Sequence, residues 1–311
     1  MVPPPDRRER RAGPSGSLTL RGLDLRWGAR TYLMAILNAT PDSFSGDGLL
    51  ADGSVALARA VDQAARALVD GADILDVGGE STRPGAEPVG AAAEAERVLP
   101  LIEALRARFE APISIDTYKA EVARQAIAAG ADLVNDVWGF RADPDLARVV
   151  AEAGVPVILM HNRSTPNSLA VAERLGGHYL GVAYTDLLAD VRSELEMSLA
   201  LARDAGVDPA KIILDPGIGF GKTPAQNLEL LDRCAELRTL GYPLLVGTSR
   251  KSFIGLTLDL PPEERLEGTA ATVAIAIARG ADIVRVHDLR SMARVARMTD
   301  AIVRRPGALA G

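Results

Sequence analysis

The sequence predicts an α/β fold, a single (β/α)8 TIM barrel with a short N-terminal β-hairpin. After Tyr32, a short apolar segment followed by an Ala- and Leu-rich amphipathic segment recurs eight times. Eight such units in roughly 280 residues fit a (β/α)8 barrel, which usually has about 250 residues. The rival is a doubly wound open sheet, which normally has fewer repeats. It is disfavoured because no Gly-x-Gly-x-x-Gly turn follows the first strand.

Each unit is placed by its apolar run and by the glycine that often follows its helix. The expected strands are Tyr32–Leu37, Asp73–Val77, Ile113–Ile115, Leu133–Val137, Val155–Met160, Lys211–Leu214, Pro243–Val246 and Ile283–Val286. The expected helices are Val55–Asp70, Ala91–Arg108, Ala120–Ala129, Pro144–Ala153, Thr185–Ala205, Ala225–Leu240, Pro262–Arg279 and Leu289–Arg304. Ahead of them, residues 18–30 alternate apolar and polar side chains around Arg21-Gly22 and Trp27-Gly28, which is typical of a hairpin.

One domain is expected to span residues 18–305. Residues 1–17 are rich in Pro, Arg, Gly and Ser with almost no bulky apolar side chains, which predicts a disordered leader. A nucleic-acid or nuclear role for the arginines of this leader is the weaker alternative. Residues 306–311 are expected to be a short tail, and the segment 163–183 shows no pattern that assigns it an element or a role.

Composition narrows the class of protein. Hydrophobic residues make up 48% of the 311 residues and aromatic ones only 4%, so Ala, Val, Leu and Ile are expected to form the core. A net charge of −6 provides no overall basic field for nucleic acid or anionic lipid, and no apolar run reaches the length of a membrane span. With Cys234 as the single cysteine and no signal-peptide h-region, a cytoplasmic protein without disulfides is expected.

Every expected strand ends in polar, hydrogen-bonding residues. The eight strand ends are Asn38-Ala39-Thr40-Pro41-Asp42-Ser43-Phe44-Ser45, Gly78-Gly79-Glu80-Ser81-Thr82-Arg83-Pro84-Gly85, Asp116-Thr117-Tyr118-Lys119, Asn135-Asp136, His161-Asn162-Arg163, Asp215-Pro216-Gly217-Ile218-Gly219-Phe220-Gly221-Lys222, Ser249-Arg250-Lys251-Ser252 and Arg285-Val286-His287-Asp288. The carboxyl ends of the strands of a barrel meet at one face, where active sites of this fold lie. The pattern therefore predicts a site on that face.

One group of these residues suits a planar nitrogen heterocycle: Asp116, Asn135, Asp215 and Lys251. A carboxylate can accept from a ring N–H and an adjacent amino group together, and a lysine can donate to a ring nitrogen or carbonyl oxygen. The alternative is that the carboxylates cap helix N-termini, where Asp is favoured, and for Asp136 the two interpretations stay open.

A second group suits an anion such as a phosphate or diphosphate. Its members are Thr82, Arg83, Arg285, His287 and Ser252. Asn38 offers an oxygen ligand for Mg2+ beside such an anion, because Mg2+ takes few protein ligands. His161 has no partner at zinc spacing, so no zinc site is expected. Gly221-Lys222-Thr223 resembles the end of a nucleotide P-loop, but Pro216 occupies the required first glycine position, which excludes that motif.

Taken together, the strand-end motifs resemble those of the dihydropteroate synthase family, the folate-pathway enzymes that sulfonamides target. The resemblance runs from about Leu18 to Arg305. It rests on the eight strand ends above, among them Ile115-Asp116-Thr117, Leu159-Met160-His161 and Leu214-Asp215-Pro216-Gly217. It implies condensation of 6-hydroxymethyl-7,8-dihydropterin diphosphate with p-aminobenzoate, giving 7,8-dihydropteroate and diphosphate.

The resemblance also implies residue roles. Asp116, Asn135, Asp215 and Lys251 are expected to hold the pterin, with Met160 and Phe220 packed beside it and Ser252 near the substrate. Asn38 is expected to bind Mg2+, and Thr82, Arg285 and His287 the diphosphate. The loops that carry Asp42, Phe44 and Arg83 are expected to close over the p-aminobenzoate pocket as a lid. Asp116, Asp42 and Arg83 are the expected catalytic residues, and a homodimer formed through barrel helices is expected.

The residues also suggest a mechanism. A good leaving group attached to an electron-rich dihydropterin favours a dissociative alkyl transfer, in which Asp116 stabilises the cation and no Ser–His or Cys–His pair is needed. Two alternatives remain: a pterin-binding paralogue without activity, and a pterin-dependent methyltransferase. The first is expected to have lost loop residues such as Asp42 or Arg83, and the second has no use for the anion group.

Overall fold

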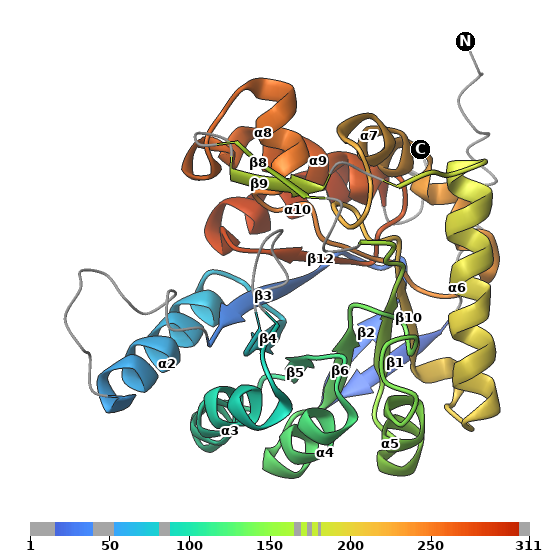
Figure 1. The fold of residues 1–311 in the computed structure, drawn as a ribbon. Coiled ribbons are helices and arrows are strands. Elements are labelled where there is room, and N and C mark those ends of the chain that lie inside the picture. Colours follow the sequence, from blue (N-terminus) through green and yellow to red (C-terminus); the bar gives the residue numbers. More distant parts are fainter. Residues whose placement is uncertain are drawn as a thin grey trace, which may run out of the picture.

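Eight parallel strands form the centre of the protein (Figure 1). This computed structural model describes residues 16–39, 53–80, 88–164, 169–172, 176–179 and 182–304. The strands are β3 (Tyr32–Asn38), β4 (Ile74–Gly78), β5 (Ile113–Asp116), β6 (Leu133–Asp136), β7 (Val157–Met160), β10 (Ile212–Asp215), β11 (Leu245–Val246) and β12 (Ile283–Val286). They pair in the order β10-β7-β6-β5-β4-β3-β12-β11, and a parallel bridge between Leu214 and Leu244 joins the two outer strands. The predicted (β/α)8 barrel is confirmed.

Helices surround this ring of strands, as Figure 1 shows. They are α2 (Gly53–Val69), α3 (Ala91–Arg108), α4 (Ala120–Ala129), α5 (Leu146–Ala153), α6 (Leu187–Asp204), α7 (Pro224–Arg233), α8 (Ser252–Leu258), α9 (Leu266–Ala278) and α10 (Leu289–Val303). Short 3-10 turns accompany them at η2 (Pro209–Lys211), η3 (Cys234–Leu240) and η4 (Pro262–Glu264). The expected helix 225–240 is thus α7 followed by η3, and the expected helix 262–279 is η4 followed by α9. The seven residues of α8 were not predicted, because so short a segment shows no clear period.

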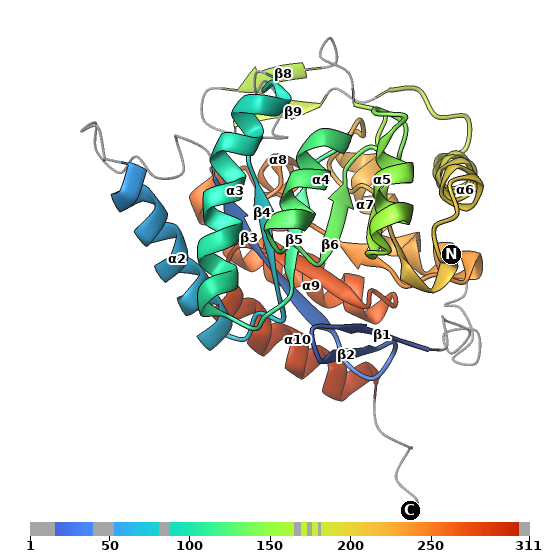
Figure 2. The same cartoon turned by 90° about the horizontal axis from the view of Figure 1, so that it is seen from below.

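Two hairpins lie at opposite ends of the barrel (Figure 2). The predicted N-terminal hairpin is confirmed as β1 (Ser17–Leu20) paired antiparallel with β2 (Leu23–Arg26). A second hairpin, β8 (Leu169–Ala172) with β9 (Gly176–Tyr179), lies in the segment 163–183, for which the sequence predicted no element. The sequence of β9, Gly-Gly-His-Tyr, has no apolar alternation from which a strand could be recognised. The expected leader lies outside the described residues except for Gly16 and Ser17, and the expected tail 306–311 lies outside them entirely.

The core has two parts. The larger fills the space between the strands and the helices, and the smaller lies inside the barrel at the amino-terminal ends of the strands. Leu18, Leu20 and Leu25 of the N-terminal hairpin belong to the smaller part, so this hairpin closes that end of the barrel. Within the described ranges, no helix combines the length and apolarity needed to cross a membrane.

A Gly-Ala-Asp sequence recurs at this closed end, just before three strands. The copies are Gly71-Ala72-Asp73, Gly130-Ala131-Asp132 and Gly280-Ala281-Asp282. Each aspartate accepts a backbone N–H from the neighbouring strand or its approach, from Leu33 (2.9 Å), Ile113 (2.8 Å) and Leu244 (3.2 Å) in turn. Each also pairs with arginine: Arg30, Arg106 and Arg238. These contacts fasten the amino-terminal ends of the strands and leave their carboxyl ends to carry the site.

Candidate active site

Arg285 of β12 connects two carboxylates at the carboxyl ends of the strands. Its Nε lies 2.6 Å from Asp76 Oδ2 on β4, and its terminal nitrogen lies 2.7 Å from Asp116 Oδ2 on β5. Asn135 of β6 donates to Asp76 Oδ2 at 3.3 Å. Asp76 is fully buried. The ends of four strands are therefore joined in one polar cluster inside the barrel.

Burial and charge oppose each other in this cluster. Burial raises the pKa of Asp116 to about 7, against the pull of Arg285, and the negative charge of Asp76 adds to the rise. Burial alone would lower the pKa of Arg285, but Asp76 and Asp116 outweigh it and hold that pKa above its ordinary value. Arg285 is therefore a permanent cation, whereas Asp116 changes protonation near neutral pH.

Asp215 and Lys251 extend the cluster to β10 and the segment before α8. Asp215 Oδ1 accepts from the backbone N–H of Gly217 at 2.7 Å, and burial raises the pKa of Asp215 against the attraction of Lys251. Lys251 donates to the carbonyl of Ile218, and its Nζ lies 4.6 Å from the centre of the Phe220 ring. Burial lowers the pKa of Lys251 to about 8, with Asp215 opposing. Lys251 is thus a donor whose charge is lost in mildly alkaline solution.

The two basic side chains lie beside each other. Both flank Gly247, where a built Cβ would lie 3.7 Å from Arg285 Cβ and 3.9 Å from Lys251 Nζ, and the charge of Arg285 helps lower the pKa of Lys251. Met160 is opposite Asp215 in the strand register and is buried. The structure thus brings together the expected pterin residues and adds Arg285 to them.

The expected anion group is only partly within the described residues. His287 Nδ1 lies 3.0 Å from Ser249 Oγ, and Asn38 ends β3 opposite Gly78 of β4. Ser252 is the first residue of α8, with Lys251 as its cap residue. Four expected site residues lie outside the described residues: Asp42, Phe44, Thr82 and Arg83. The expected lid is formed by the loops that carry these four, so it lies there too.

The alternative interpretation as helix caps is wrong for Asp116 and Asp215. The first N–H of α4 bonds to Asp143 instead (2.8 Å), and α7 is capped by Thr223. Asp136 is not a helix cap either, because its carboxylate accepts from Trp138 N (2.8 Å) and Phe140 N (2.6 Å) in the turn after β6, ahead of the start of α5. Burial raises the pKa of Asp136 to about 6.

Asp76 is a site residue that the sequence did not predict. One signal was available: a carboxylate in the middle of the apolar strand Ile74-Leu75-Asp76-Val77 is costly to bury unless it has a partner. The partner, Arg285, is 209 residues away along the chain, so the ion pair between them could not be predicted from the sequence.

Comparisons with known proteins agree with this geometry. Residues 34–287 match the family model described as "Pterin binding enzyme". A curated relative, "Dihydropteroate synthase" of Clostridium beijerinckii, is 52% identical over 279 residues, 89% of this chain and 96% of the relative. The crystal structure of a dihydropteroate synthase from Clostridium difficile in the presence of pteroic acid matches with a TM-score of 0.80 and 46% identity, covering 89% of this chain and 98% of that one.

A second solved structure extends the likeness to another ligand. It is the dihydropteroate synthase of Xanthomonas albilineans with 4-aminobenzoic acid, at a TM-score of 0.82 and 39% identity. The match covers 94% of this chain and 100% of that chain. Family model, relative and folds coincide over most of the sequence, so the chain belongs to the dihydropteroate synthase family of pterin binding enzymes.

Proposed function

We propose that this chain condenses 6-hydroxymethyl-7,8-dihydropterin diphosphate with p-aminobenzoate, giving 7,8-dihydropteroate and diphosphate, a step of folate synthesis. It is a transferase of the dihydropteroate synthase type. The observation that carries the proposal is the ring of Asp116, Asn135, Asp215 and Lys251 with Arg285 inside the strand ends, in which Asn135 and Asp215 are buried and the other three are half-buried. Such a ring offers two acceptors, an amide and a cation to one flat heterocycle.

The pterin is proposed to lie among these groups. Asp215 is buried next to Lys251, so it can accept from the N–H and amino groups of the pyrimidine ring, while Lys251 donates to the ring on another edge. Phe220 and Met160 supply apolar surface for the flat ring. Since Asn135 and Asp215 are buried, a heterocycle that lacks the matching donors would leave them unpaired and should be bound much more weakly.

The reaction is proposed to be dissociative. The bond between the pterin CH2 and the diphosphate oxygen breaks first, and its electron pair leaves with the diphosphate, whose negative charge Arg285, His287 and Thr82 bind. The resulting CH2 cation is shared with the dihydropterin ring and is stabilised by the Asp116 carboxylate. The aniline nitrogen of p-aminobenzoate then forms the new C–N bond and gives its extra proton to solvent. Asp42, Phe44 and Arg83 are proposed to hold p-aminobenzoate.

Asn38 is proposed to bind Mg2+. It ends β3 opposite Gly78, at the carboxyl ends of the strands, where its amide oxygen can serve as the single protein ligand that a phosphate-bound Mg2+ needs. When bound, Mg2+ would neutralise charge on the diphosphate oxygens.

The protein is further proposed to work in the cytoplasm as a homodimer. Its one cysteine, Cys234, is buried and free, which suits a reducing compartment. Neighbouring helices α9 and α10 expose large apolar side chains: Ile275, Met298, Ile302 and Val303. Exposed apolar surface of this kind favours burial against a second copy. Light scattering that gives the mass of a monomer at micromolar concentration would refute the dimer.

The decisive test measures 7,8-dihydropteroate and diphosphate together. Both should form in equal amounts, and both should require p-aminobenzoate and Mg2+. Asp116→Asn should lower turnover about a hundredfold or more, because a preorganised charge aimed at the transition state is worth that much. Asp145→Asn, at an exposed carboxylate on the surface, is the control and should leave turnover unchanged. Diphosphate release that needs neither p-aminobenzoate nor Mg2+ would refute the function.

A further inference from the structure

Lys222 is a buried lysine for which the reaction above has no role. It ends the loop of residues 215–222 and is only 2% exposed. Its ammonium lies 2.9 Å from the carbonyl oxygen of Gly217, 3.0 Å from that of Phe220 and 3.0 Å from His161 Nδ1. An ammonium has three donors, and here all three have an acceptor. Burying a cation is costly unless it is fully bonded, so this arrangement fixes the loop around the charge.

The loop itself has little other freedom. Gly217 has φ 70°, and a Cβ there would lie 1.8 Å from the carbonyl oxygen of His161, so no other residue fits. The backbone N–H of Gly219 donates to Asn227 Oδ1 of α7 at 2.6 Å. The loop is therefore held by Asn227 from the helix side and by Lys222 from within.

Three contacts of the pterin pocket depend on this loop. It begins with Asp215, its Ile218 carbonyl accepts from Lys251, and the ring of Phe220 lies against the same ammonium. A shift of the carbonyls that Lys222 holds would therefore displace three parts of the pocket together: the donor Lys251, the acceptor Asp215 and the apolar ring of Phe220. We infer that Lys222 is a positioning residue for pterin recognition, acting through the loop 215–221 without touching the substrate. This inference rests on the proposed pterin site.

His161 connects Lys222 to an ion-pair network. Burial lowers the pKa of His161 to about 4, with Lys222 adding to the shift, so the ring is neutral and Nδ1 can accept. Its Nε2 lies 3.2 Å from Glu194 Oε2 without a well-directed hydrogen bond. Glu194 in turn pairs with Arg141 at 2.9 Å and with Arg163. The ring is thereby enclosed, and it presents a fixed acceptor to Lys222.

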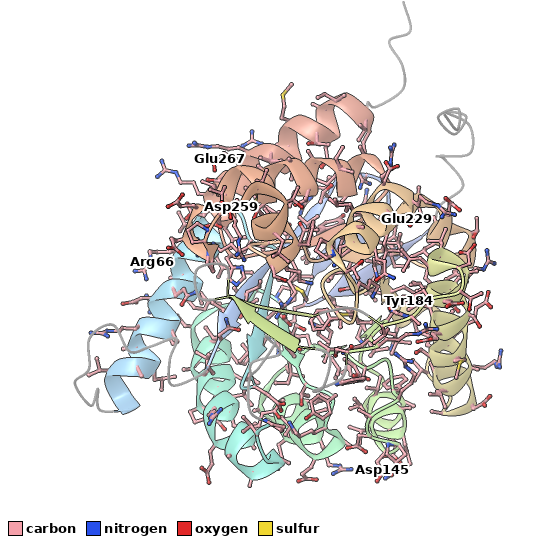
Figure 3. All side chains as sticks on the ribbon, turned by 45° about the horizontal axis from the view of Figure 1, so that its top comes forward. Arg66, Asp145, Tyr184, Glu229, Asp259 and Glu267 are labelled. Atoms are coloured by element: carbon pink, nitrogen blue, oxygen red, sulfur yellow. The ribbon has the colours of Figure 1, made fainter. Side chains whose placement is uncertain are left out.

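The outer side of the loop is covered as well. Tyr184, labelled in Figure 3, donates to the carbonyl of Gly221 at 3.4 Å, and Arg163 stacks on its ring at 4.4 Å.

Burial lowers the pKa of Lys222 to about 7, against the pull of Asp215. Because the ammonium form dominates about one pH unit below that value, the experiments are best done there.

The first experiment needs no ligand. Amide hydrogen exchange of residues 216–221 is compared in the wild type, in Lys222→Met and in Lys211→Met. Lys211 is the matched control, because its ammonium donates to a single carbonyl, that of Gly154 (2.6 Å), at the opposite end of β10. Exchange in this loop should rise about tenfold or more in Lys222→Met alone. Protection equal to that of the wild type would overturn the inference, even if the chain bound no pterin.

The second experiment measures function. Lys222→Met should weaken binding of 6-hydroxymethyl-7,8-dihydropterin diphosphate about tenfold or more in calorimetry. The KM for p-aminobenzoate should stay within about twofold of the wild type, because the loop bears on the pterin and not on the second substrate. Pterin affinity equal to that of Lys211→Met would overturn the inference, and so would an equal loss for both substrates. A wild type that binds no pterin would refute the proposed function instead, leaving the exchange result to decide on Lys222.

A milder variant covers the case in which Lys222→Met does not fold. His161→Gln removes the imidazole acceptor but leaves the two carbonyl acceptors in place. It should weaken pterin binding in the same direction by about threefold or more, with faster exchange in residues 216–221. A folded His161→Gln protein with wild-type affinity and wild-type loop protection would overturn the inference.

Discussion

Replacing Asp76 by Asn tests whether the buried arginine cluster is organised as described. Arg285 Nε loses a charged acceptor at 2.6 Å but keeps an oxygen in its place, and it also keeps Asp116. A hydrogen bond to a charged group contributes about 1.5–3 kcal/mol and a neutral one about 1 kcal/mol. The difference predicts a loss of about 1–2 kcal/mol in the free energy of unfolding.

The second oxygen of Asp76, Oδ1, has no hydrogen-bond partner within the described residues, so an amide nitrogen there replaces no existing bond. The assay is urea unfolding followed by circular dichroism. Asp145→Asn is the control, because this carboxylate lies at the periphery of the protein beside α5 (Figure 3) and is 64% exposed. A surface change of this kind should stay within about 0.5 kcal/mol. If Asp76→Asn also stays within that margin, the reasoning about the buried pair is refuted.

The remaining predictions concern activity, affinity and the closed end of the barrel. The kcat/KM for the pterin substrate should be bell-shaped in pH. This kcat/KM should fall below pH about 7, where Asp116 binds a proton and loses its charge, and above pH about 8, where Lys251 loses a proton. Asp116→Asn should remove the fall at acid pH, and a fall that persists in this variant would contradict the assignment to Asp116. Lys251→Ala should weaken pterin binding about tenfold or more in calorimetry with little effect on p-aminobenzoate, and unchanged pterin affinity would remove Lys251 from the pocket. Asp282→Ala should cost about 3–5 kcal/mol in urea unfolding, because Arg238 is left buried without its carboxylate, whereas Arg304 keeps Asp300. Its turnover per folded molecule should match the wild type, and a selective loss of turnover would contradict a purely structural role.

The repeat of strand and helix was readable from the sequence because each unit has its own local period. The bounds predicted for α3, α4 and β12 are those of the structure. The repeat also predicted that the polar strand ends lie together, because parallel strands in a barrel must all end at one face. The hairpin β8–β9 was not predicted, because its sequence shows neither the alternation of a half-buried strand nor the period of an amphipathic helix.

Pairings across the barrel were decided only by the tertiary structure. Asp76 and Arg285 lie on β4 and β12, and the pairing of both strands with β3 brings these distant parts of the chain within 2.6 Å. Likewise, Lys222 could be read only as the end of a glycine-rich loop until the fold placed His161 and two loop carbonyls around its ammonium. The barrel and the chemical types of the residues at its mouth follow from the sequence, because hydrophobic periods and residue chemistry are local. Which charges are paired and buried depends on contacts between distant segments, and those contacts set the pKa values and the geometry of the site.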